Sequence, residues 1–187
     1  MAVHWKNEIN PALAEARKKE RPVLLDFSAA PESSGCSRLE VDVYANDKVT
    51  SFINDNFVPV KVHIREQPEA FDRFGVLWTP TVVALDYAAR ERRRFTGYLP
   101  PGEFLAELEL ALADDAFARN RYAEAGSRYR EVARRFPQSE LAPEALYWAA
   151  VARYKETNDA TALVDAAREF RQMYPASIWA QKAAVWD

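Results

Sequence analysis

The sequence contains a single cysteine, Cys36, and only two histidines, His4 and His63. One cysteine excludes an intramolecular disulfide and a zinc site built from several thiolates. Two histidines that lie far apart in the chain also disfavour a metal site built from imidazoles. We therefore expect no metal site and no other cofactor.

Long apolar runs and an excess of charge are also missing. No stretch of about 18 apolar residues could span a membrane, and the N-terminal residues lack the basic stretch and apolar run of a signal peptide. The net charge is only −3, with both signs mixed along the chain, which does not favour nucleic acid as a ligand. These absences predict a cytoplasmic protein that contacts neither membranes nor nucleic acids.

The 187 residues suit one domain with a smaller appendage. Apolar periodicity and breaker residues predict the order α, β, α, β, α, β, β, α in the first part of the chain. The expected elements are a helix with its N-cap at Asn10, a strand over 22–28, helical segments over 36–44 and 47–57, a strand over 57–64, a helix over 68–74, strands over 81–85 and 91–96, and a helix after Gly102. This order predicts an α/β domain whose mixed sheet has helices on both faces.

The second part of the chain repeats itself at an interval of 38 residues. The matched pairs are Phe136 and Tyr174, Pro137 and Pro175, Ser139 and Ser177, Ala142 and Ala180, Ala145 and Ala183, and Trp148 and Trp186. Alanine and aromatic stripes with a proline at each turn are typical of stacked helical pairs. We therefore predict an all-α helical-repeat domain over 114–187, and one helix from about Glu103 to Asn120 that leads into it.

Several ordered motifs within residues 5–112 resemble the thioredoxin family. Val23–Ala29 resembles the first core strand of that family, and Cys36–Glu40 resembles the stretch that begins at the second cysteine of its Cys-x-x-Cys motif. The segment Phe74–Thr81 is similar to the one that carries the cis-proline loop. The resemblance implies a thioredoxin fold over 1–113, and the region after it resembles, more loosely, tetratricopeptide-type repeats.

The motif departs from the family's pattern at its first cysteine. It reads Ser33-Ser34-Gly35-Cys36, so that a serine takes that position. A serine hydroxyl cannot ionise near neutral pH without a base, and neither histidine has the spacing of a Ser-His pair. Cys36 is then either a small buried apolar residue or a thiol with a redox role.

Asp26 and Lys61 match, by this resemblance, the buried acid and lysine that lie under the cysteine pair of active members. In an active protein they would shuttle the proton of the thiol. They could equally be a vestigial ion pair with a structural role, because breaking a buried pair costs roughly 3–5 kcal/mol. Both readings predict that the two side chains meet.

The resemblance also implies a peptide groove beside Pro80. In the family, the peptide bond before this proline is cis, and the backbone there pairs with an extended segment of a client protein. Trp78, Thr79, Pro80 and Tyr98 are therefore the candidates for such a groove. Packing in the core or in a loop is the alternative role for Trp78 and Tyr98.

Three hypotheses for the function follow. The first is a module that binds protein partners or clients through the cis-proline groove and the helical repeats, without full dithiol activity, and that could self-associate through its C-terminal helices. The second is a thiol-disulfide oxidoreductase of cell redox homeostasis that acts through Cys36 alone. The third is that Ser33 replaces a cysteine of a dithiol enzyme. The reactivity of Cys36 in the native protein distinguishes the first hypothesis from the second.

Overall fold

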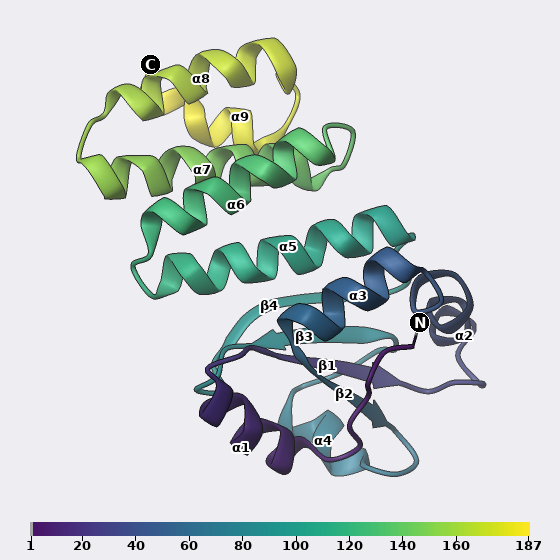
Figure 1. Cartoon of the computed structure of the whole chain (residues 1–187). Coiled ribbons are helices and arrows are strands. Elements are labelled where there is room, and N and C mark those ends of the chain that lie inside the picture. The colour runs from purple at the N-terminus through teal and green to yellow at the C-terminus, as the bar shows by residue number, and fades with distance from the viewer. Residues whose placement is uncertain (1) are drawn as a thin grey trace. The chain divides into compact units, whose positions relative to one another are not determined.

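A mixed four-stranded sheet forms the centre of the first part of the chain (Figure 1). The computed structural model describes residues 2–187. In the order β2-β1-β3-β4, β1 pairs with β2 in parallel and with β3 antiparallel, and β3 pairs antiparallel with β4. The strands are β1 (Val23–Ser28), β2 (Val58–His63), β3 (Thr81–Leu85) and β4 (Glu91–Thr96). Strand β1 is buried at every position, which is typical of a central strand.

Helices cover both faces of this sheet (Figure 1). On one face, α1 (Ile9–Lys19) and α4 (Pro68–Arg73) close an apolar core with the inward side chains of the strands. On the other face lie α3 (Asp47–Asn56) and the start of α5 (Pro101–Ala118), where Phe104 meets Phe95 edge to face at 5.3 Å. The structure confirms the predicted α/β architecture with a mixed sheet and helices on both faces.

The predicted N-cap of the first helix was wrong. Helix α1 begins at Ile9, with Glu8 as its N-cap, so Asn10 and Pro11 lie inside its first turn. Proline is tolerated there because the first N–H groups of a helix have no partner within the helix in any case. Helix α5 likewise begins at Pro101, one residue before the expected break at Gly102.

The segment that follows Ser33 is not one regular helix. Helix α2 (Ser34–Arg38) passes directly into a π-helical turn, η1 (Leu39–Val43). Single π-helical turns of this kind are frequent at functional sites.

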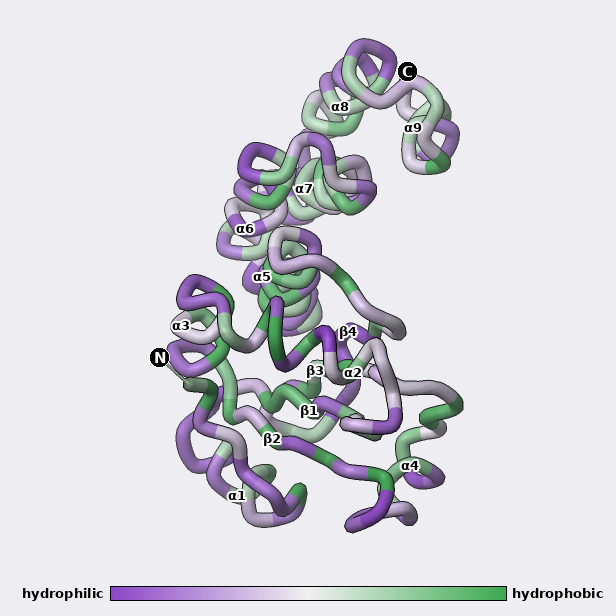
Figure 2. Tube along the Cα trace, turned by 90° about the vertical axis from the view of Figure 1, so that its right-hand side faces the viewer, coloured by the Kyte–Doolittle hydropathy of each residue, from purple (hydrophilic) through white to green (hydrophobic). Residues whose placement is uncertain are grey.

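The second part of the chain is entirely helical, as predicted. It contains α6 (Tyr122–Arg135), α7 (Leu141–Thr157), α8 (Thr161–Met173), α9 (Ile178–Ala183) and the 3-10 turn η2 (Ala184–Trp186). Hydrophobic and hydrophilic residues alternate along α6 and α8, as Figure 2 shows, which is the pattern of helices with one buried face. The buried positions are mostly alanine, with Tyr129 and Phe170 as the large side chains.

The chain divides into two units, the first ending at Leu108 and the second comprising Glu109–Asp187. Helix α5 runs without a break from Pro101 to Ala118, so the expected continuous helix is present, with slightly different ends.

Candidate functional site

Ser33 is the N-cap of α2. Its hydroxyl oxygen accepts a hydrogen bond from the backbone N–H of Cys36 at 3.3 Å and donates to the carbonyl oxygen of Thr79 at 3.4 Å. A serine is among the best residues for this position, because it satisfies one of the N–H groups that a helix start leaves free. Ser33 therefore links the start of α2 to the loop before Pro80, and within residues 2–187 no basic side chain is hydrogen-bonded to its hydroxyl.

Cys36 is enclosed. Its side chain is 2% exposed, and its sulfur accepts a hydrogen bond from the backbone N–H of Ala29 at 3.4 Å. The neighbouring Gly35 packs closely on the loop, because a Cβ atom at residue 35 would lie 2.9 Å from Cδ of Pro80. A thiol that reacts with disulfides must be accessible as a thiolate, and this thiol is covered.

The loop before Pro80 is fixed at its base and open at its tip. The Thr79–Pro80 peptide bond is cis, and the carbonyl oxygen of Pro80 accepts a hydrogen bond from Gly97 N–H at 2.8 Å. The hydroxyl of Thr81 donates to the carbonyl oxygen of Trp78 at 2.8 Å. In contrast, the Trp78 side chain is 72% exposed, so it does not belong to the core, which was one of the two roles open to it from the sequence.

Asp26 and Lys61 meet from the neighbouring strands β1 and β2. The Lys61 ammonium donates to Oδ2 of Asp26 at 2.6 Å and to Oε1 of Glu40 at 2.5 Å. The same ammonium lies over the rings of Trp5 and Tyr44, at 4.2 and 4.4 Å from their centroids. Two carboxylates and two aromatic faces thus compensate one buried cation.

Residues 9–112, more than half of the chain, match the family model described as a thioredoxin-like domain. The chain belongs to this family. Residues 33–36, the loop before Pro80, Asp26 and Lys61 lie inside the matched range, whereas Trp5 lies just before it.

Solved structures show the same fold. A thioredoxin from Thermus thermophilus is 28% identical, with a TM-score of 0.55 over 63% of this chain and 94% of that chain. A structure described as DsbH oxidoreductase is 15% identical, with a TM-score of 0.53 over 60% of this chain and 85% of that chain. No curated protein sequence matches the chain. These likenesses confirm that the first unit has the thioredoxin fold.

Asp26, Glu40 and Lys61 of this thioredoxin-like domain form one charged cluster. Burial alone would lower the pKa of Lys61, but Asp26 and Glu40 outweigh it and raise this pKa above its usual value. Burial, and then the charge of Asp26, raises the pKa of the Tyr44 hydroxyl well above its usual value. Within residues 2–187, Oδ1 of Asp26 has no hydrogen-bond partner. Lys61 is therefore the one cation between two carboxylates, and Oδ1 of Asp26 is the oxygen of this cluster that is left without a hydrogen-bond donor among the described residues.

Tyr98 stands beside the loop before Pro80. Its hydroxyl donates to Oδ2 of Asp42 at 3.1 Å, and the Arg38 guanidinium lies 5.4 Å from its ring centroid. Arg38 also donates to the same Asp42 oxygen at 2.7 Å. The hydrogen bonds from Arg38 and Tyr98 lower the pKa of the Asp42 carboxyl. Tyr98 is thus half-buried and held in one position, with part of its ring open to solvent.

The sequence did not point to several residues of this site. Trp5 and Tyr44 complete the enclosure of Lys61, although no local pattern relates them to residue 61. Leu77 was not among the candidates either, although it directly precedes Trp78, and it is 95% exposed. Glu40 was noted only as the acidic end of a motif, and it lies on the π-helical turn that brings its carboxylate to Lys61.

The remainder of the described chain offers less. No group of three or more histidine, cysteine, aspartate or glutamate side chains within residues 2–187 could hold a metal ion. No helix in the same range is long and apolar enough to cross a membrane.

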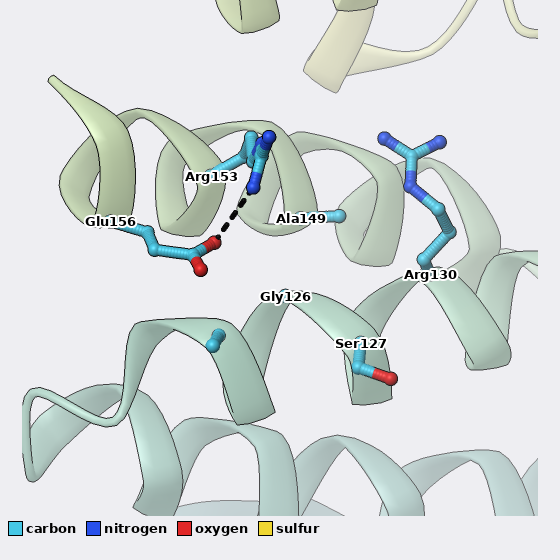
Figure 3. A pocket seen from close by; sticks show the side chains of 7 residues that line it. Gly126, Ser127, Arg130, Ala149, Arg153 and Glu156 are labelled. Atoms are coloured by element: carbon cyan, nitrogen blue, oxygen red, sulfur yellow. Dashed lines mark hydrogen bonds and ion pairs between the residues drawn. The ribbon is translucent and has the colours of Figure 1, made fainter. Parts of the chain in front are cut away.

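A hollow of about 300 Å³ lies between α6 and α7 (Figure 3). Each of its two arginines is already paired. Arg153 contacts Glu156 at 3.2 Å, as drawn in Figure 3, and Arg130 contacts Glu169 at 3.7 Å. Paired cations at an open surface do not form an anion site.

Proposed function

We propose that this thioredoxin-like protein binds an extended segment of a partner or client protein at the loop before Pro80, without dithiol exchange, and that it does so in the cytoplasm. The observation that carries the proposal is a contrast in exposure. The side chains of Leu77 and Trp78 are 95% and 72% exposed, whereas the only thiol is 2% exposed.

Two large apolar side chains next to each other at a surface favour binding. Their apolar area is removed from water only when another molecule covers it, and tryptophan is enriched among the residues that contribute most to protein interfaces. Because the carbonyl oxygens of Trp78 and Thr79 are already held by Thr81 and Ser33, the backbone below these side chains is fixed. A preorganised site loses less entropy when a partner binds.

The backbone of this loop can add to the interaction. Among residues 2–187, the backbone N–H groups of Trp78 and Thr79 donate to no backbone carbonyl. An extended peptide that runs alongside could supply those acceptors, as in other cases of strand addition. Tyr98, held by Asp42, stands next to Gly97, which bonds to Pro80, and supplies a further aromatic surface.

The competing hypothesis is a single-thiol oxidoreductase, and the identity of 28% to a thioredoxin is what favours it. Exchange through Cys36 would need its sulfur to reach a client disulfide and a second thiol to release the mixed disulfide. The chain has no second cysteine, so an external thiol would have to act in that step. The burial of Cys36 opposes the first requirement.

The two hypotheses differ in their dependence on the thiol. The probe is a fluorescently labelled polypeptide that is kept unfolded and has its own cysteines blocked, and binding is measured by anisotropy. We expect Cys36→Ser to bind it as the original protein does, and Trp78→Ser to bind at least tenfold more weakly. Ile64→Ser is the matched control, because Ile64 is an exposed apolar residue of the same unit, and it should have no effect.

Either of two results would overturn the proposal. One is binding that is unchanged by Trp78→Ser, which would place the partner elsewhere. The other is capture of a client with an intact disulfide that depends on Cys36 and is reversed by a reductant, which would support the single-thiol enzyme.

A further inference from the structure

Three positions of the 38-residue repeat are buried in its first copy and more exposed in its second. On α7, Ala142 and Leu146 are 0% and 1% exposed. Their counterparts 38 residues later are Ala180, which is half-buried, and Ala184, which is exposed. The pair between them shows the same change, since Pro143 is buried and Gln181 is exposed. The same face of the repeat is therefore covered in the first copy and uncovered in the second.

The cover of the first copy includes an amphipathic helix. Helix α8 packs on α7, and Phe170 of α8 lies in one buried cluster with Leu146. The apolar side chains of α8 follow helical spacing: Leu163, Ala166, Ala167 and Phe170 are at i, i+3, i+4 and i+7. A helix of this pattern is therefore what the covered face of the repeat accommodates.

A hollow of about 580 Å³ lies at the uncovered face, between α8 and the α9 segment. Phe170, Pro175, Ala180 and Ala184 give it apolar walls. At its edge, Arg171 and Asp187 form an ion pair with each other. The size and the apolar walls suit a row of apolar side chains rather than a charged ligand.

The charged residues beside the covered face indicate a second property of a helix that would bind at the uncovered face. Arg130 of α6, which is drawn in Figure 3, pairs with Glu169 of α8 at 3.7 Å. The counterpart of Arg130 in the second copy is Arg168, which is exposed and, among the described residues, forms an ion pair with its near neighbour Asp165 alone, at 3.4 Å. Such exposed pairs are weak and easily exchanged. A helix on the uncovered face would therefore gain from an acidic residue that reaches Arg168.

We infer that the hollow beside α9 binds an amphipathic α-helix of a partner protein, seated as α8 is seated on α7. The helix carries apolar residues at i, i+3, i+4 and i+7 and an acidic residue at i+6, the position that Glu169 holds in α8. This is helix-in-groove recognition. It is a different surface from the loop before Pro80 and does not depend on what that loop binds.

A labelled peptide with the sequence of residues 159–175 tests the inference, because that segment is the helix which the first copy binds. It is added to the intact protein, and anisotropy is measured. We expect saturable binding that Ala184→Asp weakens at least tenfold, since a charge would enter the apolar wall. Ala176→Asp, at an exposed alanine outside the hollow, should leave binding unchanged, and circular dichroism checks that both variants stay folded.

The ion pair is tested by a charge exchange. Replacing the glutamate of the peptide that corresponds to Glu169 with arginine should weaken binding severalfold, and Arg168→Glu in the protein should restore it.

Three results would overturn the inference. One is the absence of binding to the intact protein. Another is binding that survives Ala184→Asp, which would mean that the peptide displaces α8 from α7 instead of occupying the hollow. The third is a dimer in sedimentation experiments that Ala184→Asp converts to a monomer, which would make a second copy of this chain the occupant.

Discussion

The start of α2 and the loop before Pro80 touch each other, yet they differ in what they leave open. At the start of α2, the Ser33 hydroxyl is used as a helix cap, and Cys36 lies beneath the surface. In the loop, the backbone is equally well fixed, but Leu77 and Trp78 extend into solvent. The comparison shows that in this thioredoxin fold the thiol is buried while the adjoining loop keeps two large apolar side chains exposed.

The largest expected loss of stability comes from breaking the ion pair between Asp26 and Lys61. Lys61→Met would leave the carboxylate of Asp26, whose side chain is 2% exposed, without its cation. Breaking a buried pair in this way costs about 3–5 kcal/mol. We expect a loss near the lower end, about 3 kcal/mol, because the Lys61 side chain is still 19% exposed. Urea denaturation measures this loss.

A double variant is the control for this prediction. Asp26→Asn combined with Lys61→Met removes both charges, so it should be more stable than Lys61→Met alone. The contribution of Lys61 also has a defined pH range. Because its carboxylate partners raise its pKa in the folded state, the stabilisation is complete below the usual pKa of lysine and is lost as the pH rises through the raised value. A double variant no more stable than the single one would contradict the role of this pair.

An intermediate loss of stability is expected at the contact between α2 and the loop before Pro80. Gly35→Ala would place a Cβ atom 2.9 Å from the ring of Pro80, and forcing an additional group into a packed contact costs typically 1–3 kcal/mol. Gly102→Ala is the matched control, because no atom lies within 4 Å of its added Cβ. If both variants unfold at the same urea concentration, the contact between α2 and the loop is not as tight as the structure shows.

The smallest expected effect is at the helix cap. Ser33→Ala removes the acceptor for Cys36 N–H and the donor to Thr79, and the loss of an N-cap costs about 1 kcal/mol. Ser34→Ala, at the exposed neighbour, should change stability by less than half as much. A cost at Ser33 no greater than at Ser34 would show that the serine is not retained for capping.

Sequence reasoning reached most of the fold. The strands over 81–85 and 91–96 have the predicted ends, because a proline or glycine stands before the first and after the second and few other residues could end them. The helix ends were less accurate, since Asn10-Pro11 is compatible with either the cap or the first turn of α1. Strong breaker residues thus predicted the strand ends correctly, whereas the weaker capping signals did not define the helix ends.

The site was only partly predictable. Asp26 and Lys61 lie on neighbouring parallel strands, in direct register, and their pairing followed from the resemblance. Trp5 and Tyr44 could not be found, because they reach Lys61 from the N-terminal segment and from the residue after the π-helical turn, and no spacing in the sequence expresses that proximity. The exposure of Trp78 was equally hidden, since an aromatic residue before a strand suits a core or a surface.

The most direct test of whether the Cys36 site is closed is the reaction rate of its thiol. This rate is measured in the native protein with a chromogenic disulfide reagent. If it is closed, the thiol reacts only when the structure opens, so the native rate should be at least about a hundredfold below that of the urea-unfolded chain. The rate should then rise as urea lowers the stability. Immediate reaction of the native thiol, independent of stability, would contradict the closed site and make Cys36 a working thiol.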